Sequence, residues 1–196
     1  MEGSTEIAFK PHLLRFLAKR LNSLGGKMPT IVIDKKGHLT SSTLSRDVQH
    51  HLMGSRRVDH VIALTDVYTG KRDFRNAADA RSKMTSWVGS DRTFQAHAAQ
   101  YEFEAWLLPY WSRIQELAGS NRKSPPTPEL VNHNKPPSHF LSEVFRSGSR
   151  KRQYSKVRDA SKILDGQDLG EAAAKCPELK AFLNTILRLS GGKPIP

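Results

Sequence analysis

The sequence predicts an α/β fold in which a mainly parallel sheet is flanked by helices. Three short β-rich segments indicate strands, at Thr30–Asp34, Val58–Asp66 and Thr93–Ala99. Helical segments lie before, between and after them, and this alternation is typical of βαβ units with right-handed crossovers. In such sheets, ligands bind beyond the carboxyl ends of the strands, so residues at these ends are the first candidates for a site.

The helices follow from apolar residues at helical spacing. Thr5–Leu24 carries an apolar stripe and ends at Gly25-Gly26, while Pro11 within it predicts a kink. The remaining helices of the first part of the chain are expected at Thr43–Met53, Ala77–Trp87 and Glu102–Leu117.

Composition divides the chain into four parts. Residues 1–118 form the α/β domain, and 119–138 are a proline-rich loop or linker. Residues 139–190 form a basic helical C-terminal extension, and 191–196 a frayed tail. Within the extension, short helices are expected at His139–Arg146, Lys156–Leu164 and Cys176–Leu189.

The charge balance favours a nucleic-acid partner. Lysine and arginine number 31 against 19 aspartates and glutamates, which gives a formal charge of +12. The alternative is a basic surface without a specific partner. The positive charge concentrates in one segment, and the candidate phosphate contacts are Arg146, Arg150, Lys151, Arg152, Lys156 and Arg158.

Other features narrow the class of protein. The sequence has no apolar run of membrane-spanning length and no signal peptide, and Cys176 is its single cysteine. We therefore expect a soluble cytoplasmic protein without a membrane partner. No Walker-type phosphate loop is present, so the chain is not expected to hydrolyse ATP through one.

Carboxylates mark the candidate site. Asp66 ends the clearest strand, where a Mg²⁺ ligand would stand, although a strand-end aspartate is often only a turn residue. Glu2 and Glu6 flank Gly3 at the start of the first helix. There the glycine permits close approach to an ion or phosphate, and the alternative reading is simple helix capping.

Four motifs, in order, resemble the Toprim superfamily. Glu2-Gly3-Ser4-Thr5-Glu6 is similar to its glutamate motif, and Asp66-Val67-Tyr68 falls where its second acidic motif, Asp-x-Asp, stands. Gln100–Leu108 (QYEFEAWLL) resembles the hallmark of one Toprim-like family of nominally unknown function, encoded beside AAA/ABC-type ATPases in bacterial anti-phage loci. Pro137-Ser138 and Tyr154-Ser155-Lys156 resemble it too. The likeness runs from residue 2 to about 187.

The resemblance implies a Toprim-like, Rossmann-like fold and a nuclease similar to the OLD family. The implied cofactor is Mg²⁺, with Mn²⁺ as a substitute, and the implied metal ligands are Glu2, Glu6, Asp66, Glu102 and Glu104. Catalysis would fall to Glu2, Glu6, Asp66 and Lys156, with the ammonium meeting the scissile phosphate. A helix beginning at Glu102 would turn only one of Glu102 and Glu104 toward the site.

The implied partners are a separate ATPase and DNA or RNA, and the chain could also form a homo-oligomer. The apolar face predicted to dock on the ATPase carries Leu179, Phe182, Leu183, Ile186 and Leu187. A role like that of topoisomerases or primases is disfavoured, because no DNA-gate or polymerase segment accompanies the motifs.

Two departures from the family pattern support a rival hypothesis. Tyr68 replaces the second aspartate of Asp-x-Asp, and the strand that precedes Glu-Gly in the family is missing before Glu2. We expect either a true start upstream of Met1 or a noncatalytic scaffold that binds an ATPase and nucleic acid. The sequence leaves the substrate, DNA or RNA, the oligomeric state and the activating trigger open.

Overall fold

A computed structural model gives the architecture of the chain. It describes residues 4–22, 26–34, 37, 39–68, 74–89, 91–131 and 135–196, and side chains from residue 8 onward. The elements in chain order are α1 (Ser4–Asn22), α2 (Ser41–Met53), β1 (Val61–Asp66), α3 (Ala77–Val88), β2 (Phe94–Ala99), the 3₁₀ helix η1 (Phe103–Leu107), α4 (Trp111–Ala118), the 3₁₀ helix η2 (Pro128–Leu130), α5 (Pro137–Ser147), α6 (Lys156–Leu164), α7 (Leu169–Lys175) and α8 (Pro177–Leu189).

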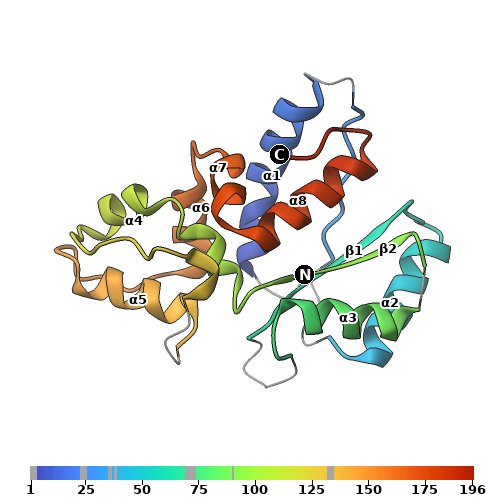
Figure 1. Cartoon of the computed structure of the whole chain (residues 1–196), viewed down its shortest axis with the longest axis horizontal. Helices are drawn as coiled ribbons and strands as arrows, with labels where there is room; N and C mark the ends of the chain where they lie inside the picture. Colours follow the sequence, from blue (N-terminus) through green and yellow to red (C-terminus); the bar gives the residue numbers. More distant parts are fainter. Residues whose placement is uncertain are drawn as a thin grey trace.

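The described residues form a parallel sheet of two strands. β1 pairs with β2 in a register that runs from Val61 opposite Phe94 to Asp66 opposite Ala99. α3 connects the strands and packs with α2 on one face, while α8 covers the other face (Figure 1). The α/β class with a parallel, helix-flanked sheet is therefore confirmed, although the sheet is smaller than predicted.

Two apolar cores lie on opposite sides of the sheet. The smaller joins α2, α3 and the face of the sheet that they cover, and it includes Met84 and Phe94. The larger joins α1, η1 and the helices from α4 to α8. α1 packs on α6 and α7, so residues on both sides of the predicted boundary at 118 share this core. None of the helices in the described part of the chain combines the length and apolar character of a membrane span.

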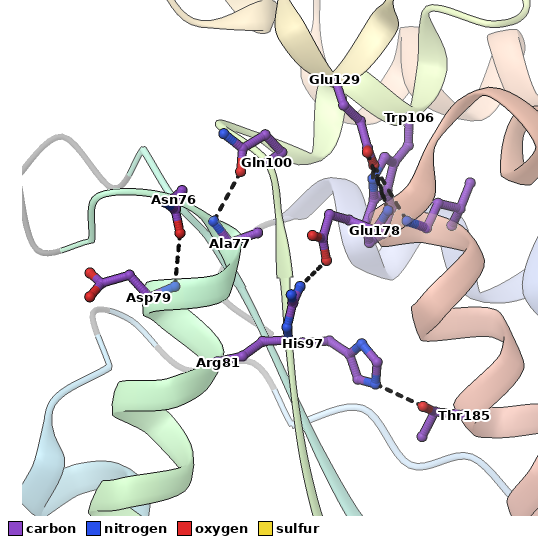
Figure 2. Close-up of polar contacts among 11 residues, drawn as sticks. Asn76, Ala77, Asp79, Arg81, His97, Gln100, Trp106, Glu129, Glu178 and Thr185 are labelled. Carbon is purple, nitrogen blue, oxygen red and sulfur yellow. Dashed lines mark hydrogen bonds and ion pairs between the residues drawn. The ribbon is translucent and has the colours of Figure 1, made fainter.

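Polar contacts fix β2 between α3 and α8 (Figure 2). On one side, the side-chain oxygen of Gln100 accepts a hydrogen bond from the amide of Ala77, 2.9 Å away, at the start of α3. On the other side, His97 lies 3.0 Å from the hydroxyl of Thr185 on α8. Burial lowers the pKa of His97 to about 4, so this imidazole is neutral at physiological pH. An ion pair between Arg81 and Glu178 joins α3 directly to α8.

A buried carboxylate secures the start of α8. Glu129 accepts hydrogen bonds from the indole of Trp106, at 2.9 Å, and from the amide of Glu178, at 3.2 Å (Figure 2). A carboxylate at this end of a helix satisfies amides that have no partner within the helix. The proline-rich segment 119–138 therefore contributes a structural residue, although it contains little regular structure.

Four sequence expectations differ from the structure. Residues 30–34 form no regular element. The helix expected over Glu102–Leu117 is two elements, η1 and α4, because Pro109 lacks the amide hydrogen that a continuous helix needs. The short helix α7 was not predicted. The tail is packed rather than frayed, since Ile195 is buried and its amide donates to Asn184 at 2.7 Å.

Candidate functional site

The candidate site begins with Asp66, the last residue of β1. Its Oδ1 accepts a hydrogen bond of 2.8 Å from the amide of Phe103, the first residue of η1. This bond ties the end of β1 to the segment that follows β2, since Phe103 comes only a few residues after the end of β2. Asp66 is therefore positioned at the carboxyl end of the sheet, as the sequence predicted.

Glu102 connects this strand end to two helices of the larger core. Its Oε2 accepts a hydrogen bond of 2.9 Å from the amide of Ser138, in the first turn of α5. Its Oε1 lies 3.5 Å from Nζ of Lys156, the first residue of α6. The start of α5 favours negative charge, and the side chain of Glu102 lies between this helix terminus and the ammonium group of Lys156.

Glu104 is the most deeply buried of these acids. It is 1% exposed, and its Oε1 lies 3.3 Å from Nζ of Lys156. The two groups lie at ion-pair distance, and this oxygen is buried without a well-formed hydrogen bond among the described residues. Burial raises the pKa of Glu104 to about 7, against the lowering effect of Lys156.

Both glutamates contact the same lysine, contrary to the expectation that only one would face the site. That expectation assumed a helix beginning at Glu102. In the structure Glu102 is extended, with φ −145° and ψ 158°, and η1 begins one residue later. In a helix, side chains two positions apart point in very different directions. Because Glu102 is extended and precedes a 3₁₀ turn, this restriction does not apply to Glu102 and Glu104, and both carboxylates reach Lys156.

The ammonium of Lys156 is the positive charge shared by the cluster. Burial alone would lower the pKa of Lys156, but Glu104, Glu102 and Asp66 together raise it above its ordinary value. The side chain is still 46% exposed. Its charge is therefore fixed by the cluster and remains accessible to a ligand. We use the name carboxylate–lysine cluster for Asp66, Glu102, Glu104 and Lys156.

Asp159 fixes the turn that presents Lys156. Its carboxylate is fully buried, and Oδ2 accepts hydrogen bonds from the amide of Ser155, at 2.7 Å, and from Arg152, at 2.8 Å. Arg158 adds a further contact of 3.2 Å to Oδ1. Sequence reasoning missed this role. The available signal was that Asp159 is the single acid in the strongly basic segment from Arg146 to Lys162.

The basic residues of this segment fall into two groups. Arg146, Arg150 and Lys151 are exposed, as expected for phosphate contacts. Arg152 is instead directed toward Asp159 and lies over the ring of Phe145, 4.4 Å from its centroid. Arg158 shares Asp159 but remains largely exposed. Arg152 therefore has a structural role in addition to the predicted nucleic-acid role.

Two predicted site residues cannot be placed with the cluster. Glu2 lies outside the described residues. Glu6 belongs to the first turn of α1, but its side chain is not among those described. Their predicted roles as metal ligands and catalytic residues stay predictions.

The donor set of the cluster suits a hard cation. Carboxylate oxygens are the ligands that Mg²⁺ prefers, and the oxygen of Glu104 is buried without a hydrogen bond. Across the described residues, no group of three or more histidine, cysteine or acidic side chains is arranged to hold a metal ion together. Lys156 supplies the positive charge in this arrangement. The carboxylates are thus of the kind that Mg²⁺ prefers, while in this structure the ammonium of Lys156 pairs with Glu102 and Glu104.

The predicted docking face of α8 is not available to a partner. Its five apolar residues lie in the larger core, all of them buried: Leu179, Phe182, Leu183, Ile186 and Leu187. The prediction was wrong because it underestimated the core, which extends over α1, η1 and α4 to α8. The ATPase partner itself stays a prediction.

Comparison with known proteins identifies the family of the chain but not its function. The family described as "Domain of unknown function (DUF4276)" matches residues 1–187, nearly the whole chain. No curated protein matches the sequence. No solved structure matches it either. Because the match covers far more than half of the chain, the protein belongs to the DUF4276 family.

Proposed function

We propose that the protein is a Mg²⁺-dependent nuclease subunit that cleaves phosphodiester bonds of DNA or RNA. The observation that carries the proposal is the convergence of Asp66, Glu102, Glu104 and Lys156. These residues come from distant parts of the chain and meet beyond the carboxyl ends of two parallel strands. Clustered acids with an accessible ammonium and a strongly shifted pKa are typical of catalytic sites.

In this proposal each residue of the cluster has a definite task. Asp66, Glu102 and Glu104 would hold Mg²⁺ or Mn²⁺, with Glu2 and Glu6 as further ligands. The ion would neutralise charge on the scissile phosphate. Lys156 would turn its exposed ammonium toward a phosphate oxygen and stabilise the charge that develops there.

The setting of the cluster supports a nucleic-acid substrate. The formal charge of +12 favours a polyanion, and Arg146, Arg150 and Lys151 are exposed on the segment that leads to Lys156. The resemblance of the motifs to Toprim-like proteins points the same way. It also supports a separate ATPase partner and a role in anti-phage defence.

The alternative function is a noncatalytic scaffold that binds nucleic acid and an ATPase. One observation favours it: Lys156 already pairs with both glutamates, as it would in a purely structural ion-pair cluster. In a scaffold, the cluster would only join β1, η1 and α6. Loss of a carboxylate would abolish cleavage if the protein is a nuclease, and would only lower the stability of the fold if it is a scaffold.

The test is Mg²⁺- or Mn²⁺-dependent cleavage of labelled DNA and RNA by the full chain together with its ATPase. Asp66→Asn keeps an oxygen that can accept the hydrogen bond from Phe103 but removes the charge. We expect it to lose cleavage and keep nucleic-acid affinity, because affinity comes mainly from lysine and arginine. Glu116→Gln, which removes an exposed acid outside the cluster, is the matched control. Equal cleavage by Asp66→Asn and the parent would reject the site, and cleavage by neither would favour the scaffold.

A further inference from the structure

The tyrosines of the chain divide sharply by position. Tyr110 is buried in the larger core, and Tyr154 is partly buried and packs against that core. Tyr68 and Tyr101 instead follow the carboxyl ends of β1 and β2, within two residues of Asp66 and Glu102 in the sequence. Tyr68 follows Asp66 by two residues and is 46% exposed, while Tyr101 directly precedes Glu102 and is partly exposed.

The backbones of Tyr68 and Tyr101 are joined to each other. The amide of Tyr68 donates to the carbonyl oxygen of Tyr101 across 2.6 Å, which extends the strand pairing beyond β1 and β2. Val67, between Asp66 and Tyr68, is buried and bonded to Ala99 at 3.1 Å. Tyr68 is therefore attached to a fixed backbone, although its side chain meets solvent.

The conformation of Tyr101 is unusual and connects it to the site. Its φ of 68° lies in the left-handed region, which residues other than glycine seldom adopt. This turn carries the chain from β2 into the extended Glu102 and into the amide of Phe103 that binds Asp66. One backbone turn therefore carries both an aromatic residue, Tyr101, and the next residue, Glu102, which belongs to the cluster.

An exposed aromatic ring beside the proposed phosphate site would have a specific use in nucleic-acid binding. Unpaired bases stack on aromatic side chains, whereas bases within a duplex already stack on their neighbours. Tyr68 stands at the position of the second acid in the Asp-x-Asp motif that this segment resembles. A ring at this position would contact the base next to the phosphate that the cluster holds.

We infer that Tyr68, with Tyr101, forms a stacking platform for an unpaired base, so the site takes single-stranded nucleic acid or an unpaired loop or end. This inference rests on the proposed function for its substrate class. It goes further by naming the strandedness of the substrate and the residues that select it. DNA and RNA share the chemistry that a stacked base requires, and the experiment distinguishes them.

The test measures binding of the full chain to fluorescent single-stranded DNA, single-stranded RNA and the corresponding duplexes in EDTA. Tyr68→Ala should weaken single-strand binding about tenfold and leave duplex binding nearly unchanged. Tyr68→Phe should stay within about twofold of the parent, since the ring and not the hydroxyl stacks. Met53→Ala, which removes an exposed apolar side chain on α2, is the control.

A second variant distinguishes loss of the ring from misfolding of the protein. Tyr68→Trp keeps a ring, so it should retain single-strand binding, and its fluorescence should be quenched by single strands but not by duplexes. An equal loss on single strands and duplexes, a Tyr68→Phe as weak as Tyr68→Ala, or no binding by the parent would overturn the platform. If binding behaves as expected but no variant or parent cleaves with Mg²⁺, the platform stands and the nuclease proposal fails.

Discussion

Nζ of Lys156 lies 3.3 Å from Oε1 of Glu104, a carboxylate oxygen that accepts no hydrogen bond from the described residues. The pair joins the first residue of α6 to η1, which follows the end of β2. Burial holds the pKa of Glu104 near 7 in spite of the neighbouring ammonium. A buried acid of this kind is destabilising when it is charged, so the pair gives the fold a measurable dependence on pH.

Glu104→Gln should stabilise the protein at pH 8. Above the ordinary carboxyl pKa the unfolded chain releases the proton of Glu104, while the folded chain keeps it until pH 7 is passed. The stability of the parent therefore falls as pH rises from about 4.5 through about 7, by up to about 3 kcal/mol. The glutamine removes this loss, so the advantage of the variant should shrink toward pH 5.

The measurement is denaturant unfolding of the parent and Glu104→Gln at pH values from 5 to 8. Glu116→Gln is the control, because Glu116 is an exposed acid that pairs only with Arg113 among the described residues. A Glu104→Gln protein that is less stable than the parent at pH 8 would show that the carboxylate is stabilised by groups beyond Lys156.

Lys156→Met should destabilise the protein at pH 8 by about 2 kcal/mol, because it leaves buried carboxylates without their shared cation. The figure is below that for a fully buried pair, since the lysine side chain is half exposed. The cost should fall at pH 5, where Glu104 is protonated. It should also fall in the double variant with Glu104→Gln, and unfolding of all four proteins measures this coupling. If the stability changes of Lys156→Met and Glu104→Gln simply add in the double variant, Lys156 and Glu104 do not pair directly.

Arg152 and Arg150 should behave differently although they are near neighbours in the basic segment. Arg152→Ala removes a partner from Asp159, which is fully buried, and should cost about 2 kcal/mol of stability. Arg150 is exposed and makes no ion pair among the described residues, so Arg150→Ala should stay within about 0.5 kcal/mol of the parent. Thermal unfolding compares the two, and equal stability would contradict the structural role of Arg152.

The exposed arginines should affect binding instead. Arg146→Ala with Arg150→Ala removes two exposed charges, and the slope of log affinity against log salt should fall by about 0.9 for each phosphate that is no longer neutralised. We expect the slope to fall by up to about 2 for duplex DNA, with little change in stability. Titrations at several salt concentrations measure this slope. An unchanged slope would place the nucleic-acid surface elsewhere.

Much of the fold could be predicted from local sequence patterns. β1 and β2 were expected because short apolar runs with helices between them indicate parallel strands, and the structure has both. Pro109 was the missed signal in the helix expected from Glu102, since a proline interrupts helical hydrogen bonding. The buried face of α8 was misread because surface and core are not distinguished by the amphipathic pattern of one helix.

The residues of the candidate site could be named from the sequence, but the contacts between them could not. Asp66 could be identified from its place at the end of a strand, and Glu102, Glu104 and Lys156 from motif resemblance. The extended backbone at Glu102 depends on its tertiary contacts with Ser138 and Lys156, so local propensity does not specify it. The buried Asp159 likewise depends on a turn whose packing involves distant helices.

Direct titration of the full chain with Mn²⁺ tests the central claim, that the carboxylate–lysine cluster holds a divalent cation. Bound Mn²⁺ can be counted by electron paramagnetic resonance in the parent, in Glu102→Gln with Glu104→Gln, and in Glu116→Gln with Glu143→Gln. The second pair removes the exposed Glu116 and the partly exposed Glu143, both outside the cluster, and so matches the change in charge. We predict that the parent and this control bind Mn²⁺ and that Mg²⁺ displaces it, while the cluster variant no longer binds the ion. Equal Mn²⁺ binding by all three proteins, or none by the parent, would contradict the assignment.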